Sequence, residues 1–584
     1  MNPLVFATRA DHPLAGPVAD GIVAARHVAG AAVLMDLAFG GSTHERSADE
    51  WLLVALLMQS PEGEHSCLDL GDMQRHVPDG VESTAVQSLR RGEQHWLEVA
   101  QRLIGLVGVP GDRQGVPLVL DGRRLYLARL FADECFIADD LTSRSKKNQL
   151  SVLMGGPGSG KTTATAIRLL EVLETAPAGF SIALAAPTGK AALRMRSVLS
   201  EKLREAAQRS GTDDGSRTER VMEVLNASES TTLHRLLGFS PTRTDGRYKF
   251  NGDQRLPHDL VIVDECSMLS LEMLTNLLRA VRDDASLWIV GDADQLASVG
   301  AGTVLADVRE AARRPGTPLA TIAELTDMHR FKDEQIKRLV TAVRDAGGTS
   351  GQSLEEQVAR FFEVLEQPSR ALRWIDPIAD PGAVEGLMRD AIDRARSIAA
   401  IATGGDAEGA TAEWFAETAN QVQMLCVHRA GRLGVAGINQ RIRSALGARA
   451  AEHWYPGRPV MVTRNDRRTN LFNGDTGTVV RRPDGSKVVL LSEPIGREPV
   501  PVARVEHHEL AYAMTVHKSQ GSEFSHVVAI MPTEPSGLCT REMLYTAISR
   551  TQDRLTLVAT RAVLEHMLRT PISRATGLAD RFGA

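Results

Sequence analysis

Residues 151–173 read SVLMGGPGSGKTTATAIRLLEVL, and their pattern is the clearest indication of the fold class. Its first four residues predict a buried strand, the glycines predict a tight loop, and the residues from Thr163 onward predict a helix. Glycine lets successive backbone N–H groups turn toward one anion, and the helix N-terminus adds a positive partial charge. The pattern GxxxxGK[ST] therefore predicts a phosphate site. Its residues are Gly155, Gly156, Pro157, Gly158, Ser159, Gly160, Lys161, Thr162 and Thr163.

The chemistry of this loop predicts ATP and Mg²⁺ as its ligands. Lys161 is expected to reach the β- and γ-phosphates, and the Thr162 hydroxyl is expected to ligate Mg²⁺. A second apolar run, LVIV at 260–263, ends in Asp264 and Glu265. Because ligands bind at the carboxyl ends of parallel strands, we expect Asp264 to hold the Mg²⁺ shell. Glu265 is then expected to orient and deprotonate the attacking water.

Three further side chains complete the expected catalytic set. Gln295 lies in GDADQL, after the apolar run LWIV, and could sense the γ-phosphate by hydrogen bonding. Arg330 in ELTDMHRFKDEQ and Arg550 in LYTAISRT are candidate arginine fingers. Such cations stabilise transition-state charge when two lobes close on a nucleotide.

Other polar clusters follow predicted strands. AAPTGKAA carries Thr188 and Lys190 just before a helix, where backbone amides and a hydroxyl suit a nucleic-acid phosphate. TTLHRLLG carries His234 nearby in the expected sheet. The densest cluster is AYAMTVHKSQGSEF, which contributes Thr515, His517, Lys518, Ser519, Gly521 and Glu523.

The composition excludes several classes of protein. The chain has 584 residues, 43% hydrophobic and 24% charged, with a formal net charge of −6. These values exclude a mainly disordered chain and a uniformly basic nucleic-acid coat, although a local basic channel is compatible with them. No stretch approaches the roughly 18 apolar residues of a membrane span, and the start lacks a secretory pattern. Five scattered cysteines without a CxxC pair argue against disulfides and zinc, so a cytoplasmic location is expected.

The order of strand-like and helix-like runs predicts an α/β protein with several domains. Residues 1–140 are expected to form a helical domain. Residues 150–345 predict a first parallel-sheet domain, with a small hairpin inserted at 243–257. Residues 346–584 predict a second such domain, with a small β-barrel inserted at about 457–510.

The order of the motifs resembles that of superfamily-one helicases. Seven motifs occur in the order expected for that superfamily: GGPGSGKTT, APTGKAA, TLHRLLG, VDECSM, GDADQLASVGAG, AMTVHKSQGSEF and YTAISR. GRPVMVTRND…LFNGDTG at 457–477 is similar to the RecD-like branch. The N-terminal GEHSCLDL at 63–70 is similar to a segment of RecD subunits in the RecBCD helicase–nuclease, exodeoxyribonuclease V.

This resemblance implies an ATP-dependent 5′-to-3′ DNA helicase with two RecA-like P-loop motor domains. It implies a role in double-strand-break repair by homologous recombination, single-stranded DNA and duplex ends as substrates, and RecB and RecC as partners. The N-terminal domain is expected to dock on RecC. By motif, the ATP site comprises Lys161, Thr162, Asp264, Glu265, Gln295, Arg330, Gly521, Glu523 and Arg550. By motif, the residues near DNA are Thr188, Lys190, His234, Thr515, His517, Lys518 and Ser519.

The sequence leaves other functions open. Relatives carry an adenine-reading glutamine before the phosphate loop, and residues 135–148 contain none. A stand-alone RecD-like helicase fits the same motifs, as does a regulatory assembly subunit with weak ATPase activity. A nuclease of the restriction type needs an acidic residue two positions before a lysine. None of the ten lysines has one, so nuclease activity is expected on a partner chain.

Overall fold

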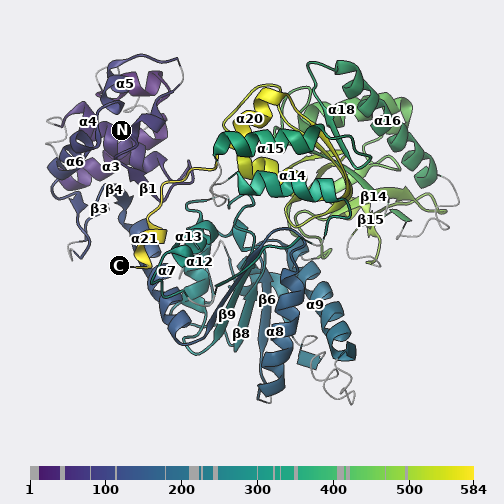
Figure 1. The fold of residues 1–584 in the computed structure, drawn as a ribbon, viewed down its shortest axis with the longest axis horizontal. Coiled ribbons are helices and arrows are strands. Elements are labelled where there is room, and N and C mark those ends of the chain that lie inside the picture. Colours follow the sequence, from purple (N-terminus) through teal and green to yellow (C-terminus); the bar gives the residue numbers. More distant parts are fainter. Residues whose placement is uncertain are drawn as a thin grey trace.

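Two parallel β-sheets flanked by helices form the body of the protein, as the alternation of strands and helices predicts (Figure 1). This computed structural model describes residues 12–583 outside the following positions: 40–45, 79, 112–114, 178, 210–222, 225–227, 241–246, 299, 320–321, 329, 347–352, 404–413, 416–417, 419–420, 467 and 493–496.

The first sheet defines lobe 1, and its six strands all run parallel. In spatial order they are β10 (Ile322–Leu325), β5 (Leu150–Gly155), β9 (Ser286–Gly291), β8 (Leu260–Val263), β6 (Ile182–Ala186) and β7 (Glu229–Thr232). The central strands are buried on both faces, which explains why they read as continuous apolar runs. This order brings the carboxyl ends of β5, β9 and β8 side by side.

Helices cover both faces of lobe 1. On one face, α8 (Lys161–Thr175) and α9 (Gly189–Arg209) pack against alternate residues of the central strands. On the other face lie α7 (Ala128–Lys146), α12 (Leu271–Ala280) and α13 (Val304–Arg313). The short α11 (Leu233–Leu236) follows β7.

The inserted hairpin expected at 243–257 is described only in part, since Gly246 lies outside the described residues. Its arms are hydrogen-bonded, from Ser240 N–H to Arg247 O at 2.8 Å and from Lys249 N–H to Gly238 O at 3.3 Å.

The second sheet defines lobe 2, and its five strands are also parallel. In spatial order they are β11 (Leu372–Ile375), β20 (Thr551–Val558), β19 (Phe524–Ile530), β12 (Val422–Cys426) and β18 (Ala513–Thr515). The helices around it are α14 (Glu334–Asp345), α15 (Leu354–Glu366), α16 (Pro381–Thr403), α18 (Val435–Leu446), α19 (Arg541–Ile548) and α20 (Arg561–Arg569).

An antiparallel sheet is inserted between β12 and β18, within the range where the sequence predicts a barrel. In spatial order its strands are β16 (Val500–Pro501), β15 (Lys487–Leu491), β14 (Thr476–Arg481), β13 (Pro459–Val462) and β17 (His508–Leu510). Alternate valines, including Val460, Val479 and Val489, form its small core. Among the described residues no pairing joins β16 to β17, so closure into a barrel stays a prediction.

The N-terminal domain contains a sheet as well as the helices that the sequence predicts. Its helices are α2 (Ala15–Ala19), α3 (Ala25–Phe39), α4 (Ala48–Gln59), α5 (Thr84–Leu89) and α6 (Glu93–Arg102). Its strands are β1 (Cys67–Asp69), β4 (Arg124–Leu127), β3 (Leu118–Asp121) and β2 (Val107–Gly108), in that spatial order. Asp121 pairs with Arg124, so the turn between β3 and β4 is Gly122-Arg123. Glycine at the first position of a two-residue turn is a hairpin signal that the helical prediction did not use.

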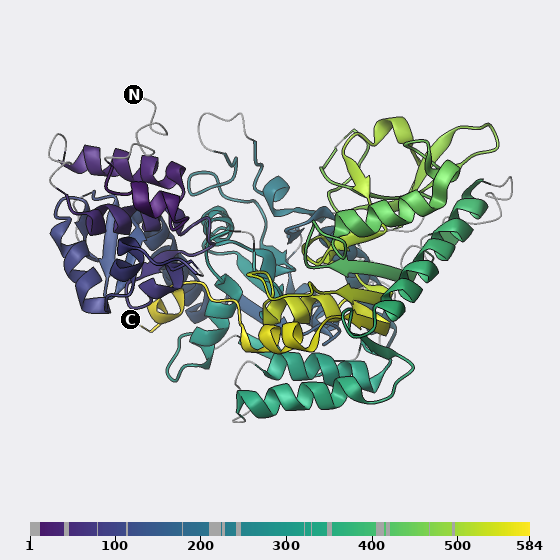
Figure 2. The same ribbon diagram turned by 90° about the horizontal axis from the view of Figure 1, so that it is seen from above.

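The structure divides the domains at different residues from those predicted. The helix α7 runs through residue 140, and Leu130, Ile137 and Leu141 belong to the core of lobe 1. The helix α14, expected in the first domain, packs in the core of lobe 2. After α20 the chain returns to lobe 1 as a C-terminal tail, residues 572–583, which contains α21 (Leu578–Arg581) (Figures 1 and 2).

Asp307 gives this tail contact a pH dependence. The carboxylate is buried and accepts hydrogen bonds from Thr303 Oγ1 at 3.0 Å and Thr576 Oγ1 at 3.2 Å. Burial, reinforced by the nearby Glu134 and Glu310 carboxylates, raises the pKa of Asp307 to about 7. The native state therefore binds more protons than the unfolded state between about pH 4 and 7, and stability falls as the pH rises through that window.

We expect Asp307→Asn to raise the melting temperature at pH 8 by about 2 °C or more, with little change at pH 5. The amide keeps the shape of the side chain and removes the buried charge. Thermal melts of the full chain at both pH values test this, with the exposed Asp390→Asn on α16 of lobe 2 as the control. An equal loss of stability at both pH values would contradict the prediction.

Candidate active site

A cavity of about 400 Å³ lies between the lobes, at the carboxyl ends of the lobe 1 strands. All six predicted catalytic residues line it, and so do most of the predicted phosphate loop, Gly521 and Glu523. Its lining residues are Pro157, Gly158, Ser159, Gly160, Lys161, Thr162, Thr163, Ala191, Arg194, Met195, Val198, Asp264, Glu265, Gln295, Arg330, Gly521, Glu523 and Arg550. Gly155 and Gly156 line a separate polar cavity behind the loop.

The phosphate loop has the backbone that its glycines predict. Gly158 and Gly160 have φ values of +68° and +85°. A Cβ atom on Gly158 would lie 2.1 Å from the Cβ of Arg330, so only glycine lets the chain pass this close. The Ser159 hydroxyl is buried and has no hydrogen-bond partner among the described residues. An anion in the loop would supply that partner.

Lys161 is folded against the loop itself. Its Nζ donates to the carbonyl oxygens of Gly155 at 2.6 Å and Gly156 at 2.9 Å. The ammonium therefore sits at the start of α8 and can exchange these carbonyls for phosphate oxygens.

The two acidic residues after β8 have distinct geometries. Glu265 has a φ of +55°, a left-handed conformation that costs free energy in a residue with a side chain. Its N–H donates to Asp264 Oδ1 at 2.8 Å, which orients the Asp264 carboxylate. Burial raises the pKa of Asp264, the neighbouring Glu265 adds to that rise, and Lys161 opposes it. A cation beside Asp264 would offset the burial of its charge.

The donor set fits Mg²⁺. Asp264 and the Thr162 hydroxyl line the same cavity and supply the oxygen ligands that Mg²⁺ prefers. In the described part of the chain, no three His, Cys, Asp or Glu side chains form a metal cluster. The remaining ligands would then be phosphate oxygens and water, as is usual for Mg²⁺ at nucleotide sites.

A buried polar network joins the lobes beside the loop. Arg550 of lobe 2 donates from Nη2 to Gln295 Oε1 of lobe 1. The Gln295 amide donates to Asp292 Oδ2 at 2.8 Å, and the Tyr545 hydroxyl of α19 donates to the same oxygen at 3.2 Å. All four side chains are buried. This arrangement fixes which end of the Gln295 amide faces Arg550.

The backbone next to Gln295 is also held by lobe 2. The N–H of Leu296 donates to Thr546 Oγ1 at 2.9 Å, and its carbonyl accepts from Gln520 Nε2 at 3.2 Å. Any separation of the lobes therefore acts directly on this segment.

Arg330 reaches the cavity from the segment between β10 and α14. Its Nη2 pairs with Glu523 Oε1 at 2.6 Å, and Arg194 of α9 binds the same carboxylate. Burial alone would raise the pKa of Glu523, but the two guanidinium groups outweigh it and lower the pKa to about 2. Glu523 thus holds two arginines that face the cavity.

The residues predicted to lie near DNA are only partly accessible. His234 is exposed, and its ring packs against Phe239 at 5.3 Å between centroids. Thr188 and His517 are half-buried. Lys518 is also half-buried, and its Nζ binds Glu509 Oε1 at 2.5 Å.

Three other predicted DNA contacts are buried. Ser519 is fully buried, and its hydroxyl donates to Val516 O at 2.7 Å within a tight turn. Short hydroxyl side chains commonly bond local backbone in this way. Lys190 and Thr515 are also buried. The structure therefore does not bring these three side chains to the surface.

Three further residues of the site were not among those predicted from the sequence. Arg194 lies one helical turn after Lys190 in α9, and no local pattern marks it. Asp292 and Tyr545 lie within the recognised motifs GDADQL and YTAISR, but their contact joins positions 253 residues apart. The available signal was the position of Asp292 at the end of the apolar run LWIV, where strand ends meet in a parallel sheet.

Three family models match parts of this chain, and each describes a helicase-related or nucleotide-binding domain. Residues 29–126 match the family described as RecBCD enzyme subunit RecD, N-terminal domain. Residues 141–301 match an AAA domain, and residues 510–558 match the UvrD-like helicase C-terminal domain.

Individual relatives extend these matches. The RecBCD enzyme subunit RecD of Mycolicibacterium smegmatis is 36% identical over 575 residues, covering 92% of this chain and 94% of the relative. The ATP-dependent RecD2 DNA helicase of Deinococcus radiodurans is 29% identical, covering 70% of this chain and 46% of the relative. The crystal structure of the Pif1 helicase from Bacteroides with ADP-AlF3 and single-stranded DNA has a TM-score of 0.38, at 18% identity over 73% of this chain and 91% of that one.

The fold and the cavity define a two-lobed P-loop nucleotide-binding protein. The chain belongs to the family of RecBCD enzyme subunit RecD, which confirms the resemblance in its motifs. Among the described residues, no helix combines the length and apolar character that crossing a bilayer requires.

We expect Tyr545→Phe to lower the kcat for ATP hydrolysis about tenfold, with little change in KM, because hydrogen bonds to charged groups are worth about 1.5–3 kcal/mol. The change removes the bond to Asp292 and keeps the aromatic ring. Steady-state kinetics measure it. Tyr512→Phe is the control, since that hydroxyl bonds Tyr455 at 3.1 Å elsewhere in lobe 2. Equal losses in both variants would refute a specific role.

Proposed function

We propose that this chain is an ATP-dependent DNA helicase that moves 5′ to 3′ as a motor subunit of a RecBCD-type complex. Its role would be double-strand-break repair by homologous recombination. The observation that carries the proposal is the contact of Arg550 and Gln295, from opposite lobes, at the cavity that Lys161 lines. A site assembled from two lobes can convert nucleotide turnover into relative movement. Membership of the RecD family supports the choice of DNA as substrate.

The residues of the cavity divide the chemistry between them. Lys161 binds the β- and γ-phosphates in place of the loop carbonyls. Water attacks the γ-phosphorus and gives its proton to the Glu265 carboxylate, while the bond from that phosphorus to the bridging oxygen breaks. The products are ADP and inorganic phosphate. Thr162 and Asp264 would hold Mg²⁺, which neutralises phosphate charge when bound.

The arginines provide the link to movement. Arg550 is bonded to Gln295, and Arg330 is bonded to Glu523. A γ-phosphate offers both cations a stronger, charged acceptor. Its arrival moves the arginines from these partners to the phosphate and so changes the contact between the lobes, and its loss returns them.

DNA is proposed to cross the face formed by Thr188, His234, His517 and Lys518. These are the accessible members of the predicted set. Contacts to phosphates and stacked bases do not depend on sequence, which movement along any strand requires.

RecB and RecC are the proposed partners, and the nuclease activity is placed on a partner chain. Val33 and Leu37, one turn apart on α3, are 53% and 80% exposed. Exposed apolar residues at this spacing suit docking of the N-terminal domain on another protein, for which RecC is proposed. The proposed substrates are single-stranded DNA and duplex ends, and the proposed compartment is the cytoplasm, where this DNA lies.

We expect Lys161→Ala to give a folded chain without DNA-stimulated ATPase activity, because the phosphates lose their ammonium contact. The control is Lys202→Ala, which removes an ion pair with Glu205 on the surface of α9. Phosphate release with and without single-stranded DNA measures the effect. Normal turnover by Lys161→Ala would overturn the assignment of the phosphate site.

We expect the chain to unwind 5′-tailed duplexes and to leave 3′-tailed duplexes intact. Strand-displacement assays with and without RecB and RecC test both direction and partnership. Unwinding of 3′-tailed duplexes by the chain alone would contradict the direction. Full activity of a lone chain that binds neither partner would favour the stand-alone helicase.

A further inference from the structure

The C-terminal tail leaves lobe 2 and runs onto the other two parts of the molecule (Figure 2). Its last anchor on lobe 2 is Ile572, whose N–H donates to Glu542 Oε2 of α19 at 2.8 Å. Only two residues later, Arg574 contacts both the N-terminal domain and lobe 1. The tail ends in α21, which packs against α7 and α13 of lobe 1.

Arg574 is surrounded by acceptors and is only 5% exposed. It pairs with the carboxylate of Glu64 in the N-terminal domain. Its guanidinium also donates to three backbone carbonyls of lobe 1, those of Ser298 at 2.8 Å, Gly300 at 3.2 Å and Gly302 at 2.8 Å. The N–H of Gly302 in turn donates to Glu64 O at 2.9 Å. One side chain therefore fixes this loop of lobe 1 against the N-terminal domain.

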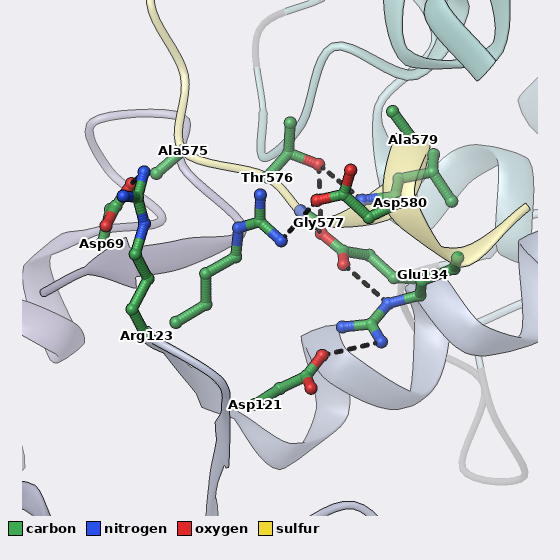
Figure 3. Close-up of polar contacts among 12 residues, drawn as sticks. Asp69, Asp121, Arg123, Glu134, Ala575, Thr576, Gly577, Ala579 and Asp580 are labelled. Atoms are coloured by element: carbon green, nitrogen blue, oxygen red, sulfur yellow. Dashed lines mark hydrogen bonds and ion pairs between the residues drawn. The ribbon is translucent and has the colours of Figure 1, made fainter. Parts of the chain in front are cut away.

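Glu134 of α7 is a second junction, and Figure 3 shows it facing the tail at Thr576 and Gly577. Its carboxylate is fully buried. It accepts four hydrogen bonds, from Ser66 Oγ at 2.5 Å, Thr576 Oγ1 at 3.1 Å, Gly577 N at 3.2 Å and Arg581 Nε at 3.0 Å. A buried carboxylate with this many donors keeps its charge compensated only while the tail stays in place.

The tail fits closely against the N-terminal domain. A Cβ atom on Gly577 would lie 2.1 Å from the hydroxyl of the fully buried Tyr126, so a larger residue at this position has to displace the tail or the Tyr126 side chain. Asp580 bridges the same two parts, binding Arg124 of the N-terminal domain at 2.6 Å and Arg314 of lobe 1 at 2.7 Å.

The receiving surface is the segment 63–70, which the sequence analysis singled out and the ATP site does not use. The N–H of Ala575 donates to His65 Nδ1 at 2.9 Å, and the N–H of Ser66 donates to Ala575 O at 3.0 Å. Together with Glu64, these residues form a short docking edge for the tail.

The loop that Arg574 holds begins three residues after Gln295. The segment that begins at Gln295 is anchored at two places. At its start it is bonded to lobe 2, since Gln295 accepts from Arg550 and the Leu296 N–H donates to Thr546. The other end is bonded to Arg574. The position of the Gln295 side chain therefore depends on both anchors.

We propose that the tail is a strap and that Arg574 is a positioning residue, which holds the loop after Gln295 against the N-terminal domain and so keeps Gln295 in place for ATP hydrolysis. This rests on the proposed function. A partner that shifts the N-terminal domain would act on the ATP site through this contact.

Arg574→Ala in the full chain tests the proposal. We expect kcat to fall roughly ten- to hundredfold, because small misplacements of a catalytic group carry costs of that order. KM for ATP should change less than about twofold, since the phosphate loop is untouched. Exchange of the Gly302 amide hydrogen should become faster. Arg574→Lys, which keeps the charge and fewer donors, should restore part of the kcat.

Gly577→Val is the second variant. It disturbs the fit of the tail against Tyr126 and keeps the Arg574 side chain. It should lower kcat in the same way. The matched control is Arg569→Ala, just before the tail, which removes only an exposed ion pair with Glu355. Its kcat should stay at the wild-type value.

The outcomes separate the strap from the proposed function. A wild-type chain without DNA-stimulated ATPase activity refutes the proposed function, and exchange at Gly302 then decides whether the strap holds the loop. If the wild-type chain is active, and Arg574→Ala changes neither kcat nor the exchange of the Gly302 amide hydrogen, the strap is refuted. If Arg574→Ala fails to fold, an unchanged kcat in folded Gly577→Val refutes it equally.

Discussion

The contact of the Arg550 guanidinium with the Gln295 amide joins two lobes that share no strand. Both side chains are buried, so neither can be left without a partner at low cost. Asp292 and Tyr545 complete the network, and this combination defines the lobe arrangement in the structure. Arg330 also comes close to Gly158, since it follows β10, the strand that pairs with β5 beside the phosphate loop. In this structure these contacts lie at one side of the nucleotide cavity, where Gln295 and Arg550 line it.

Much of this arrangement could be predicted from local sequence. The run LVIV at 260–263 is the strand β8, and the loop from Gly156 to Gly160 lies between β5 and α8. Such patterns need only neighbours in the chain, because strand, turn and helix signals have periods of two to four residues. The motifs also placed Asp264, Gln295 and Arg550 at one cavity, although their catalytic roles stay predictions.

The features that sequence could not predict depend on distant pairs or on burial. The bond of Arg574 to Glu64 joins residues 510 positions apart, and no local pattern encodes it. Ser519 lies inside a motif attributed to DNA, yet its hydroxyl bonds the backbone of its own turn. Motif matching identifies a segment but does not decide which side chains of that segment face outward. The sheet in the N-terminal domain is different, since Gly122 at the start of the turn between β3 and β4 was a readable signal.

The chain passes between the lobes twice, once between β10 and α14 and again between Ile572 and Arg574. The second passage is short, since two residue steps span about 7 Å at most. Two bodies linked at two places lose most of their six rigid-body degrees of freedom and keep mainly a rotation about the line through both links. The tail therefore favours hinged opening of the two lobes over their complete separation.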